Sequence, residues 1–220
     1  MMFGSHNRLA HIKCLSQRLQ MLGSQFELHV LTDQLNLFND SRIKEIYHER
    51  IDDELMHHAT PHAGRKLLLS GERHLTLNKI LLWNMTDFRR IIYMDPDIYL
   101  QNLPDRLMRT NFTQRIAAVH GCGGYFNSGF IVLAPDTDIF KEIFTKMRSN
   151  YPIACDRSKD RDQSVLNHVF KHDWFRLESF WNVGTHYHKK SNYTGLLNRG
   201  SNIHFVAELK PSNICNSSSW

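Results

Sequence analysis

The chain has 220 residues, of which 22% are charged, and a formal net charge of +5 at pH 7. This length is sufficient for one well-cored α/β domain, and no stretch rich in Pro, Gly and Ser divides it, so residues 1–220 are predicted to form a single domain. The basic residues are scattered and accompany no helix-turn-helix or RNA-binding motif, which argues against a nucleic-acid partner. No apolar run is long enough to span a membrane, and no signal peptide begins at Met1.

The chain is predicted to open on a helix. Apolar residues recur at helical spacing over residues 9–22, and Gly23 follows as a C-cap. Apolar residues alternate with polar ones in QFELHVLT, which predicts a strand that ends near Thr32. Residues 39–47 are ambiguous, and residues 57–65 have the composition of a loop.

The stretch LTLNKILLWNMTDF, residues 75–88, is predicted to be a helix with one face formed by Leu77, Ile80, Leu81 and Asn84. Lys79 belongs to this helix and, by local pattern, would be a solvated lysine. The short apolar run Ile91, Ile92, Tyr93 and Met94 follows and is typical of a buried strand.

Asp95 and Asp97 stand at the carboxyl end of that strand, with Pro96 between them. In open α/β sheets ligands bind just beyond the carboxyl ends of strands, and two carboxylates one residue apart can face one hard cation. The pattern alone is weak, because the chain contains two other Asp-x-Asp triplets.

The other two triplets open helical patterns. Asp136 and Asp138 precede an amphipathic run and are predicted to act as an N-cap and a first-turn charge. Asp160 and Asp162 also precede a helical run, but Gln163 shares their surface, so both a structural and a chemical role stay open for them.

The second half of the chain alternates strands with helices, which predicts an α/β fold with a mostly parallel sheet. Strands are predicted at residues 115–120, 130–133 and 174–177, and residues 181–188 form an aromatic-rich loop. Asn127 stands at the start of a strand, where it is either a turn residue or a ligand contact. His204, on a short strand, is either a core histidine or a metal ligand, and Lys210 six residues later favours a metal-bound diphosphate.

Four cysteines, Cys14, Cys122, Cys155 and Cys215, have neither zinc-site spacing nor the density of a disulfide framework, so neither is predicted. Sequons for N-glycosylation begin at Asn84, Asn111, Asn192 and Asn216, and they would act only if the chain entered the secretory pathway.

Five segments, LNKILLW, RIIYMDPD, YFNSGFIVLAP, DQSVLN and HFVAELKP, resemble the successive landmarks of glycosyltransferase family 8, whose retaining enzymes include glycogenin and galactinol synthase. The resemblance covers nearly the whole chain. It implies the GT-A fold for nucleotide-diphospho-sugar transferases, with a mostly parallel, Rossmann-like sheet flanked by helices. It also implies a UDP-sugar donor and transfer of a hexosyl or pentosyl group with retention of configuration.

The resemblance implies a role for each matching residue. Asp95 and Asp97 correspond to the metal-binding Asp-x-Asp, with Asp95 also near the ribose, and His204 corresponds to the third manganese ligand. Lys210 corresponds to the lysine that holds the diphosphate. The positions that match the donor-sugar pocket are Lys79, Asn127, Asp162 and Gln163, of which Asp162 and Gln163 are expected nearest the anomeric carbon.

The implied chemistry suits these residue types. Negative charge builds on the diphosphate as its bond to the sugar breaks, and a divalent cation together with a lysine would stabilise it. Mn²⁺ accepts two carboxylates and an imidazole better than Mg²⁺ or Ca²⁺ does. Carboxylate and amide groups beside the sugar could stabilise positive charge at the anomeric carbon.

The sequence departs from the family pattern in several places. Residues 1–6 are too short and polar to supply the family's first strand, so the sheet is expected to lack a central strand and the domain to be truncated at its N-terminus. Ala207 replaces a glycine, Ser212 replaces a tryptophan, and Pro96 stiffens the Asp-x-Asp loop.

Three hypotheses follow for the activity. The first is a manganese-dependent glycosyltransferase that uses a UDP-sugar, and the second is a non-catalytic relative with a partial nucleotide-sugar site. The third is a metal-dependent phosphohydrolase, which would use the same ligand types. The acceptor (a glycan, a polyol or a protein), the oligomeric state and the compartment (cytoplasm or Golgi lumen) have no signature in the sequence.

Overall fold

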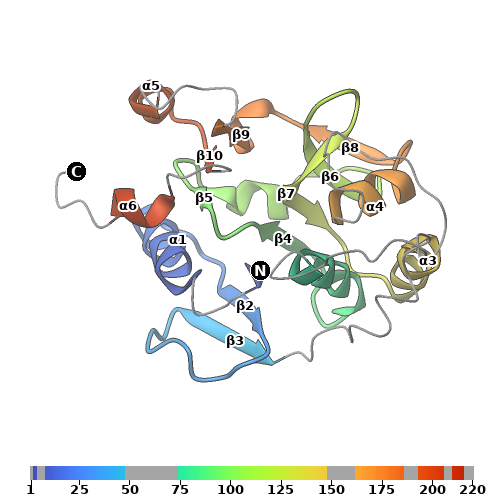
Figure 1. Cartoon of the computed structure of the whole chain (residues 1–220), viewed down its shortest axis with the longest axis horizontal. Coiled ribbons are helices and arrows are strands. Elements are labelled where there is room, and N and C mark those ends of the chain that lie inside the picture. The colour runs from blue at the N-terminus through green and yellow to red at the C-terminus, as the bar shows by residue number, and fades with distance from the viewer. Residues whose placement is uncertain are drawn as a thin grey trace. The chain divides into compact units, whose positions relative to one another are not determined.

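A computed structural model of the chain describes residues 2–3, 8–47, 74–147, 162–185, 193–205 and 210–215. The chain divides into two compact units, each built from segments that are distant in sequence (Figure 1). The first unit comprises Met1–His48, Ile92–Asn111 and Leu177–Trp220, and the second comprises Glu49–Ile91 and Phe112–Arg176. Within the described ranges, no helix is both long enough and apolar enough to cross a membrane.

A parallel sheet of three strands begins the first unit. Strands β1 (Met2–Phe3), β2 (Leu28–Thr32) and β3 (Ile43–Tyr47) lie in that order, with β2 between its two parallel neighbours. The prediction that the chain opens on a helix is therefore wrong, although β1 has only two residues and lies at the edge of this sheet. A strand of two residues has no periodicity to read, and only its register, with Met2 opposite Val30, identifies it.

Helix α1 (Leu9–Met21) follows β1 and buries the apolar face that its sequence predicted, including Ile12, Leu15 and Leu19. Its end is also confirmed. Gly23 adopts a φ of 76°, and the backbone N–H groups of Gly23 and Ser24 bond to Gln20 and Leu19 in the last turn.

A second small sheet of the first unit joins three distant segments. Strand β10 (Ile203–His204) lies between β5 (Ile98–Tyr99), which is antiparallel to it, and β9 (Val183–Gly184), which is parallel. Residues 181–184, predicted to be loop, instead supply β9 and the end of a 3₁₀ helix, η4 (Ser179–Trp181). Strand β9 has two residues, too few for an alternating pattern. A further 3₁₀ helix, η3 (Pro104–Met108), follows β5.

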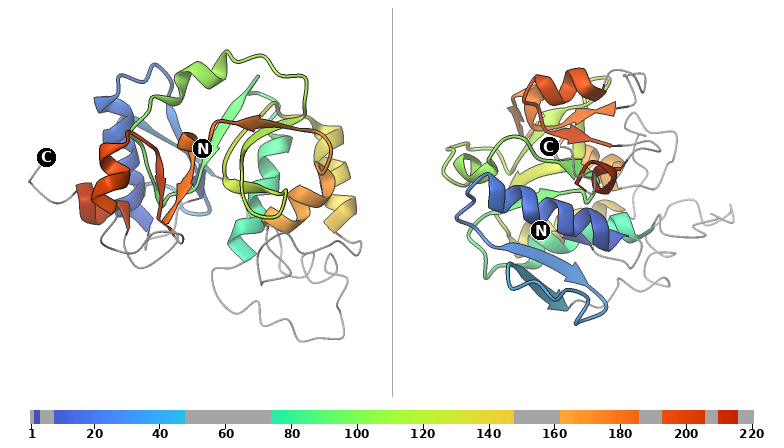
Figure 2. Two further views of the ribbon diagram at one scale, coloured as in Figure 1. Left: turned by 90° about the horizontal axis from the view of Figure 1, so that it is seen from above. Right: turned by 90° about the vertical axis from the view of Figure 1, so that its left-hand side faces the viewer.

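The C-terminal helices complete the first unit, and a disulfide joins the last of them to α1. Helix α5 (Tyr193–Asn198) precedes β10, and α6 (Pro211–Cys215) lies beside α1 in both Figure 1 and Figure 2. Cys14 of α1 bonds to Cys215 of α6, 201 residues away. Cysteine spacing did not indicate this disulfide, because tertiary packing brings the two residues together and leaves no signature in the sequence.

The second unit combines helices with an antiparallel strand pair. Strand β6 (Ile116–His120) pairs antiparallel with β7 (Phe126–Leu133) and lies between β7 and β8 (Trp174–Leu177) in one sheet. Three helices contact one another in this unit: η2 (His74–Asn84), which is a 3₁₀ helix, α3 (Thr137–Met147) and α4 (Asp162–Val169). Strand β4 (Ile91–Met94), buried as predicted except for the half-buried Ile92, begins at the last residue of the second unit and continues into the first.

The predicted helical face of η2 is confirmed for its apolar members and not for its polar one. Leu77, Ile80 and Leu81 are buried, whereas Asn84, the last residue of the helix, is exposed. Trp83 is fully buried and stacks on Phe170 with the ring centroids 5.4 Å apart.

The second Asp-x-Asp triplet caps α3, as predicted. Asp136 Oδ1 accepts hydrogen bonds from the backbone N–H groups of Asp138 (2.7 Å) and Ile139 (3.1 Å). Asp138 lies within the first turn of the helix and pairs with Lys141 at 3.0 Å on the exposed surface. The capping function therefore belongs to Asp136, and Asp138 contributes a surface ion pair.

Replacing the two carboxylates in turn separates these contributions. We expect Asp136→Ala to lower the free energy of unfolding by about 1 kcal/mol, because two helix N–H groups lose their acceptor. Asp138→Ala should lower it by no more than about 0.5 kcal/mol, because an exposed ion pair stabilises little. Urea unfolding measures both, and equal losses would contradict the assignment of the cap.

Candidate active site

A tight turn presents Asp95 and Asp97 at the carboxyl end of β4. The N–H of Ile98 bonds to the carbonyl of Asp95 at 3.1 Å, which closes a four-residue turn with Pro96 at its second position. Proline is favoured there because its ring presets the backbone angle, and aspartate is favoured at the first position. The local sequence thus fixes the two carboxylates one residue apart on a rigid turn.

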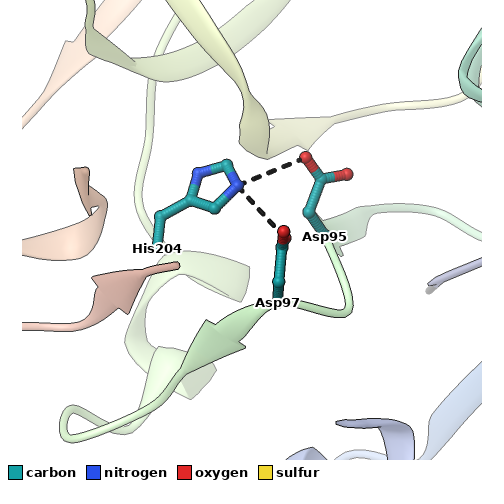
Figure 3. Close-up of side chains that lie close together, drawn as sticks. All are labelled: Asp95, Asp97 and His204. Atoms are coloured by element: carbon teal, nitrogen blue, oxygen red, sulfur yellow. Dashed lines mark ion pairs between the residues drawn. The ribbon is translucent and has the colours of Figure 1, made fainter. Parts of the chain in front are cut away.

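Strand β10 brings His204 to this turn from more than one hundred residues away. His204 pairs with Ile98 in the antiparallel register, and the N–H of Phe205 bonds to the carbonyl of Asp97 at 2.9 Å. The imidazole Nε2 consequently lies 3.2 Å from Asp97 Oδ1 and 3.7 Å from Asp95 Oδ2 (Figure 3). One ligand atom from each of the three residues lies within 4.8 Å of the others, so this group could hold a metal ion.

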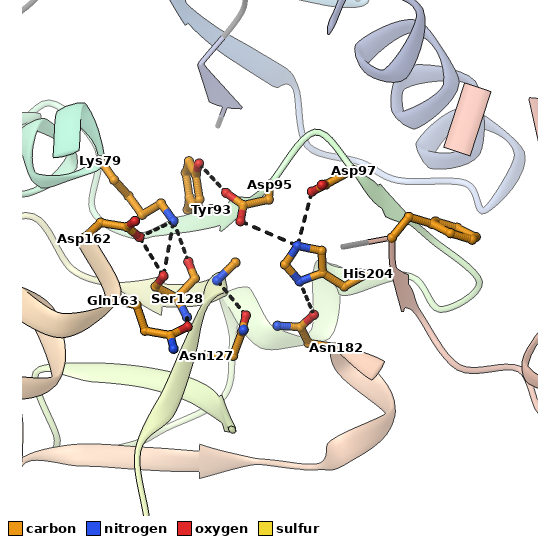
Figure 4. Close-up of polar contacts among 12 residues, drawn as sticks. Lys79, Tyr93, Asp95, Asp97, Asn127, Ser128, Asp162, Gln163, Asn182 and His204 are labelled. Carbon is orange, nitrogen blue, oxygen red and sulfur yellow. Dashed lines mark hydrogen bonds and ion pairs between the residues drawn. The ribbon is translucent and has the colours of Figure 1, made fainter. Parts of the chain in front are cut away.

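Two neighbours orient these side chains. Asn182 Oδ1 lies 3.1 Å from His204 Nδ1. Because an amide oxygen can only accept, this contact places a hydrogen on Nδ1 and leaves Nε2 facing the carboxylates, where it donates to them when the ring is protonated and offers a lone pair when the ring is neutral. The hydroxyl of Tyr93 donates to Asp95 Oδ1 at 2.7 Å, which fixes the orientation of the Asp95 carboxylate (Figure 4).

A lysine adds positive charge beside the carboxylates. Lys210 Nζ donates to Asp97 Oδ2 at 3.1 Å and to the carbonyl of Phe205 at 2.8 Å. Burial on its own would raise the pKa of Asp97, but its hydrogen bond and charge interactions with His204 and Lys210 outweigh burial and hold that pKa well below its usual range. The Asp97 carboxylate is therefore ionised at neutral pH.

His11 of α1 is a neighbour of this group that sequence patterns did not single out. Burial and then the charge of Lys210 lower the pKa of His11, while the charge of Asp97 acts in the opposite direction. Its Nδ1 is buried and has no hydrogen-bond partner among the residues that the structure describes. His11 is thus a neutral imidazole within electrostatic reach of Lys210 and Asp97.

The second unit contains a separate polar network around Lys79. Lys79 is only 2% exposed, and its Nζ donates to Asp162 Oδ2 at 2.6 Å and to the carbonyl of Ser128 at 2.9 Å (Figure 4). Ser128 Oγ also donates to Asp162 Oδ2, at 2.6 Å. The local expectation of a solvated lysine is wrong, because α4 and β7 enclose the ammonium group with oxygen acceptors.

Amide side chains extend this network. Gln163 Oε1 accepts from the N–H of Ser128 at 3.2 Å, and Asn127 Oδ1 accepts from the N–H of Gly129 at 2.9 Å. Asn127 and Ser128 belong to β7 itself, so neither is the turn residue that the sequence left possible. Asn167 of α4 bonds to both the N–H and the carbonyl of Phe126, which holds α4 against the start of β7.

The eight residues singled out by sequence thus form two groups. The first unit brings together Asp95, Asp97, His204 and Lys210, and the second brings together Lys79, Asp162, Gln163 and Asn127 through β7 and α4. Tyr93 and Asn182, which orient the first group, were not predicted as site residues, because neither belongs to a recognisable motif. Asp160 and Ala207 lie outside the described residues.

Comparison with known proteins identifies the family of the chain. The sequence model for Glycosyl transferase family 8 matches residues 2–212. Glycogenin of Neurospora crassa is 27% identical over 201 residues, which are 90% of this chain and 28% of that protein. UDP-glucuronate:xylan alpha-glucuronosyltransferase 1 of Arabidopsis thaliana is 28% identical over 110 residues, which are 50% of this chain and 15% of the relative. The chain therefore spans less than a third of the length of either relative.

Solved structures extend the likeness to the fold. The galactosyltransferase LgtC, crystallised with donor and acceptor sugar analogues, has a TM-score of 0.62 at 16% identity, and the match covers 96% of this chain and 87% of the LgtC chain. The glycosyltransferase GlyE of Streptococcus pneumoniae has a TM-score of 0.66 at 16% identity, and the match covers 96% of this chain and 55% of the GlyE chain. The chain has the GT-A fold, and the match of the family model over nearly its whole length makes it a member of glycosyl transferase family 8.

Proposed function

We propose that residues 1–220 form one catalytic domain of a metal-dependent, retaining glycosyltransferase that moves a hexosyl or pentosyl group from a UDP-sugar to an acceptor. The observation that carries the proposal is the convergence of Asp95, Asp97 and His204 with Lys210 beside them. The membership of family 8 supports glycosyl transfer as the reaction. The relative that uses UDP-glucuronate supports a UDP-linked donor. A glycan, a polyol or a protein would be the acceptor.

The donor set of the first group fits a divalent cation. Two carboxylates and an imidazole, which presents its Nε2 lone pair in the neutral form, give an oxygen and nitrogen set of net charge −2, which matches a divalent ion and suits Mn²⁺. Asp95, Asp97 and His204 would hold the ion, with Tyr93 and Asn182 fixing two of the ligands. When bound, the cation would offset the negative charge of the departing UDP.

Lys210 is proposed to hold the diphosphate of the donor. Its ammonium group already neutralises part of the charge of Asp97, and it is about one-third exposed, so it can reach an incoming anion. As negative charge grows on the leaving phosphate oxygens, a fixed ammonium beside them lowers the energy of the transition state. Asp95 is proposed to contact the ribose as well as the metal.

The network around Lys79 is proposed to contact the donor sugar. Asp162 and Gln163 would stand nearest the anomeric carbon, where a carboxylate and an amide can stabilise developing positive charge and hydrogen-bond the sugar hydroxyls. Lys79 and Ser128 hold the Asp162 carboxylate in one orientation. Lys79 and Asn127 are proposed as further contacts to the sugar.

The metal-diphosphate site can be tested without knowledge of the acceptor. Calorimetric titration of UDP into the purified chain should detect binding that requires Mn²⁺. Asp97→Asn should abolish that binding while circular dichroism stays unchanged, because one carboxylate ligand is lost. The matched control is Asp138→Asn, which alters an exposed carboxylate of another Asp-x-Asp triplet and should bind UDP normally. Binding that survives in Asp97→Asn would remove Asp97 from the site.

Turnover then separates the three hypotheses. With an acceptor screen, a transferase releases UDP at a rate that depends on the acceptor and yields a glycosylated product. A phosphohydrolase would release inorganic phosphate without any acceptor. Binding of UDP with no turnover on any acceptor would support a non-catalytic relative.

Asn182 provides a test of the orientation of His204. We expect Asn182→Ala to weaken Mn²⁺ binding by about 10-fold to 100-fold, because the ring loses the acceptor that fixes its tautomer. Asn182→Asp retains an oxygen acceptor at the same place and should bind Mn²⁺ far better than the alanine variant. Equal affinities in the two variants would show that the hydrogen bond does not position the ligand.

Lys79 and Asp162 allow the structural and chemical parts of their roles to be separated. Lys79→Met should lower the free energy of unfolding by about 3–5 kcal/mol, because the buried Asp162 carboxylate loses its cation. Adding Asp162→Leu removes the stranded charge and should restore most of the stability, whereas sugar transfer should remain absent. If the double variant transfers sugar at the native rate, the pair serves the fold alone.

A further inference from the structure

Sequons with exposed asparagines occur in both units of the structure. Asn84 ends η2, and Asn111 lies in the segment between η3 and β6. Both asparagines are exposed, as are Thr86 and Thr113, the hydroxyl residues of their sequons. A further sequon, Asn39-Asp40-Ser41, precedes β3, and its Asn39 and Ser41 are also exposed.

The three asparagine amides are available for reaction. None of the three side chains forms a hydrogen bond with another described residue, unlike Asn127, Asn167 and Asn182, whose amides bind backbone or side-chain partners. Acceptor asparagines of this kind lie on surface loops or element ends, because the attached oligosaccharide is bulky and hydrated. Asn192 and Asn216 lie outside the described residues.

The oxidation state of the cysteines points to the compartment in which such sequons are used. Cys14 is 1% exposed and belongs to a core cluster with Tyr99, Ile203 and Phe205, against which Cys215 packs. Its bond to Cys215 ties α1 to α6, and Cys122 is disulfide-bonded as well. Structural disulfides form and persist in oxidising compartments and are rare in a reducing cytosol.

We propose that this chain folds in the oxidising lumen of the secretory pathway and carries N-linked oligosaccharides on Asn39, Asn84 and Asn111. The two observations are independent of each other, since the disulfide depends on packing of the first unit and the sequons depend on exposure in both units. The proposal goes beyond the glycosyl-transfer function, because here the chain is a substrate of glycosylation.

N-glycosylation and disulfide formation are the two covalent steps. In the first step, the side-chain amide nitrogen of asparagine attacks the anomeric carbon of an oligosaccharide carried on a lipid diphosphate. A carbon–nitrogen bond forms, the carbon–oxygen bond to the diphosphate breaks, the nitrogen gives up a proton, and the lipid diphosphate leaves. In the second step, the thiols of Cys14 and Cys215 lose two protons and two electrons to a disulfide-bearing oxidoreductase, which is reduced to a dithiol.

The test uses the protein tagged at its own locus and purified from the cells that encode it. The thiols are alkylated before any reduction, and the chain is then treated with peptide N-glycosidase in heavy-oxygen water. We expect conversion of Asn39, Asn84 and Asn111 to aspartate labelled with heavy oxygen. We also expect the Cys14 peptide to remain linked to the Cys215 peptide until it is reduced.

Paired variants make each assignment specific. Asn84→Gln and Thr86→Ala should remove the same glycan, because one deletes the acceptor and the other deletes the hydroxyl that the sequon requires. Asn111→Gln and Thr113→Ala should do likewise. Asn198→Gln is the matched control, because Asn198 is exposed but begins no sequon, and its glycan pattern should equal that of the native chain.

Unmodified asparagines at all three positions, together with alkylated Cys14 and Cys215 in the unreduced protein, would overturn the proposal. This outcome differs from a failure of the proposed activity, because the masses report modification of the chain whether or not it transfers sugar. A chain that is glycosylated but inactive would support this inference and count against catalysis.

Discussion

The pairing of β10 with β5 is the constraint on which the candidate metal-binding group of Asp95, Asp97 and His204 depends. Two strands of two residues each set the register that places His204 opposite Ile98, and the bond from the N–H of Phe205 to the carbonyl of Asp97 carries the pairing to the Asp-x-Asp turn. So few ladder bonds would stabilise little by themselves. Asn202 supports them, because its Oδ1 accepts from the N–H groups of both Gln101 and Asn102. The Cys14–Cys215 disulfide then fastens α6, the element that follows Lys210, to α1.

Nearby positive charge allows the carboxylates of Asp95 and Asp97 to lie close together. Asp95 and Asp97 would repel if they were alone, and the partly buried site makes that repulsion stronger than in water. Lys210 offsets one charge, and a cation held by the three ligands would offset the rest. In the second unit the same problem is solved internally, because Lys79 and Asp162 neutralise each other at 2.6 Å with both side chains almost fully buried. The group around Asp95 and Asp97 has uncompensated negative charge and therefore suits a cationic ligand. The Lys79–Asp162 pair has no net charge and suits a neutral ligand.

Sequence patterns predicted the parts of the site that depend on local structure and family landmarks. The apolar strand Ile91–Met94, the turn after it and the amphipathic helix α4 each have a recognisable pattern, so Asp95, Asp97 and Asp162 could be placed on their elements. The patterns could not predict what long-range packing decides. The burial of Lys79 depends on β7 and α4, and Asn182, which contacts His204, comes from the segment after η4. Strands β1 and β9 are too short for any periodicity.

The three Asp-x-Asp triplets also show that one sequence pattern can have different roles, which depend on the structure around each carboxylate. Asp136 accepts the helix N–H groups of α3 because it lies just before the first turn, and its carboxylate is thereby occupied. Asp162 starts α4 and is occupied by Lys79 and Ser128. Asp95 and Asp97 end a strand, where the following turn offers no free helix N–H groups, so their oxygens are satisfied by Tyr93, His204 and Lys210 instead. Asp95 and Asp97 are the candidate ligand pair because they follow a strand, where no helix N–H group occupies their oxygens and His204 can approach them.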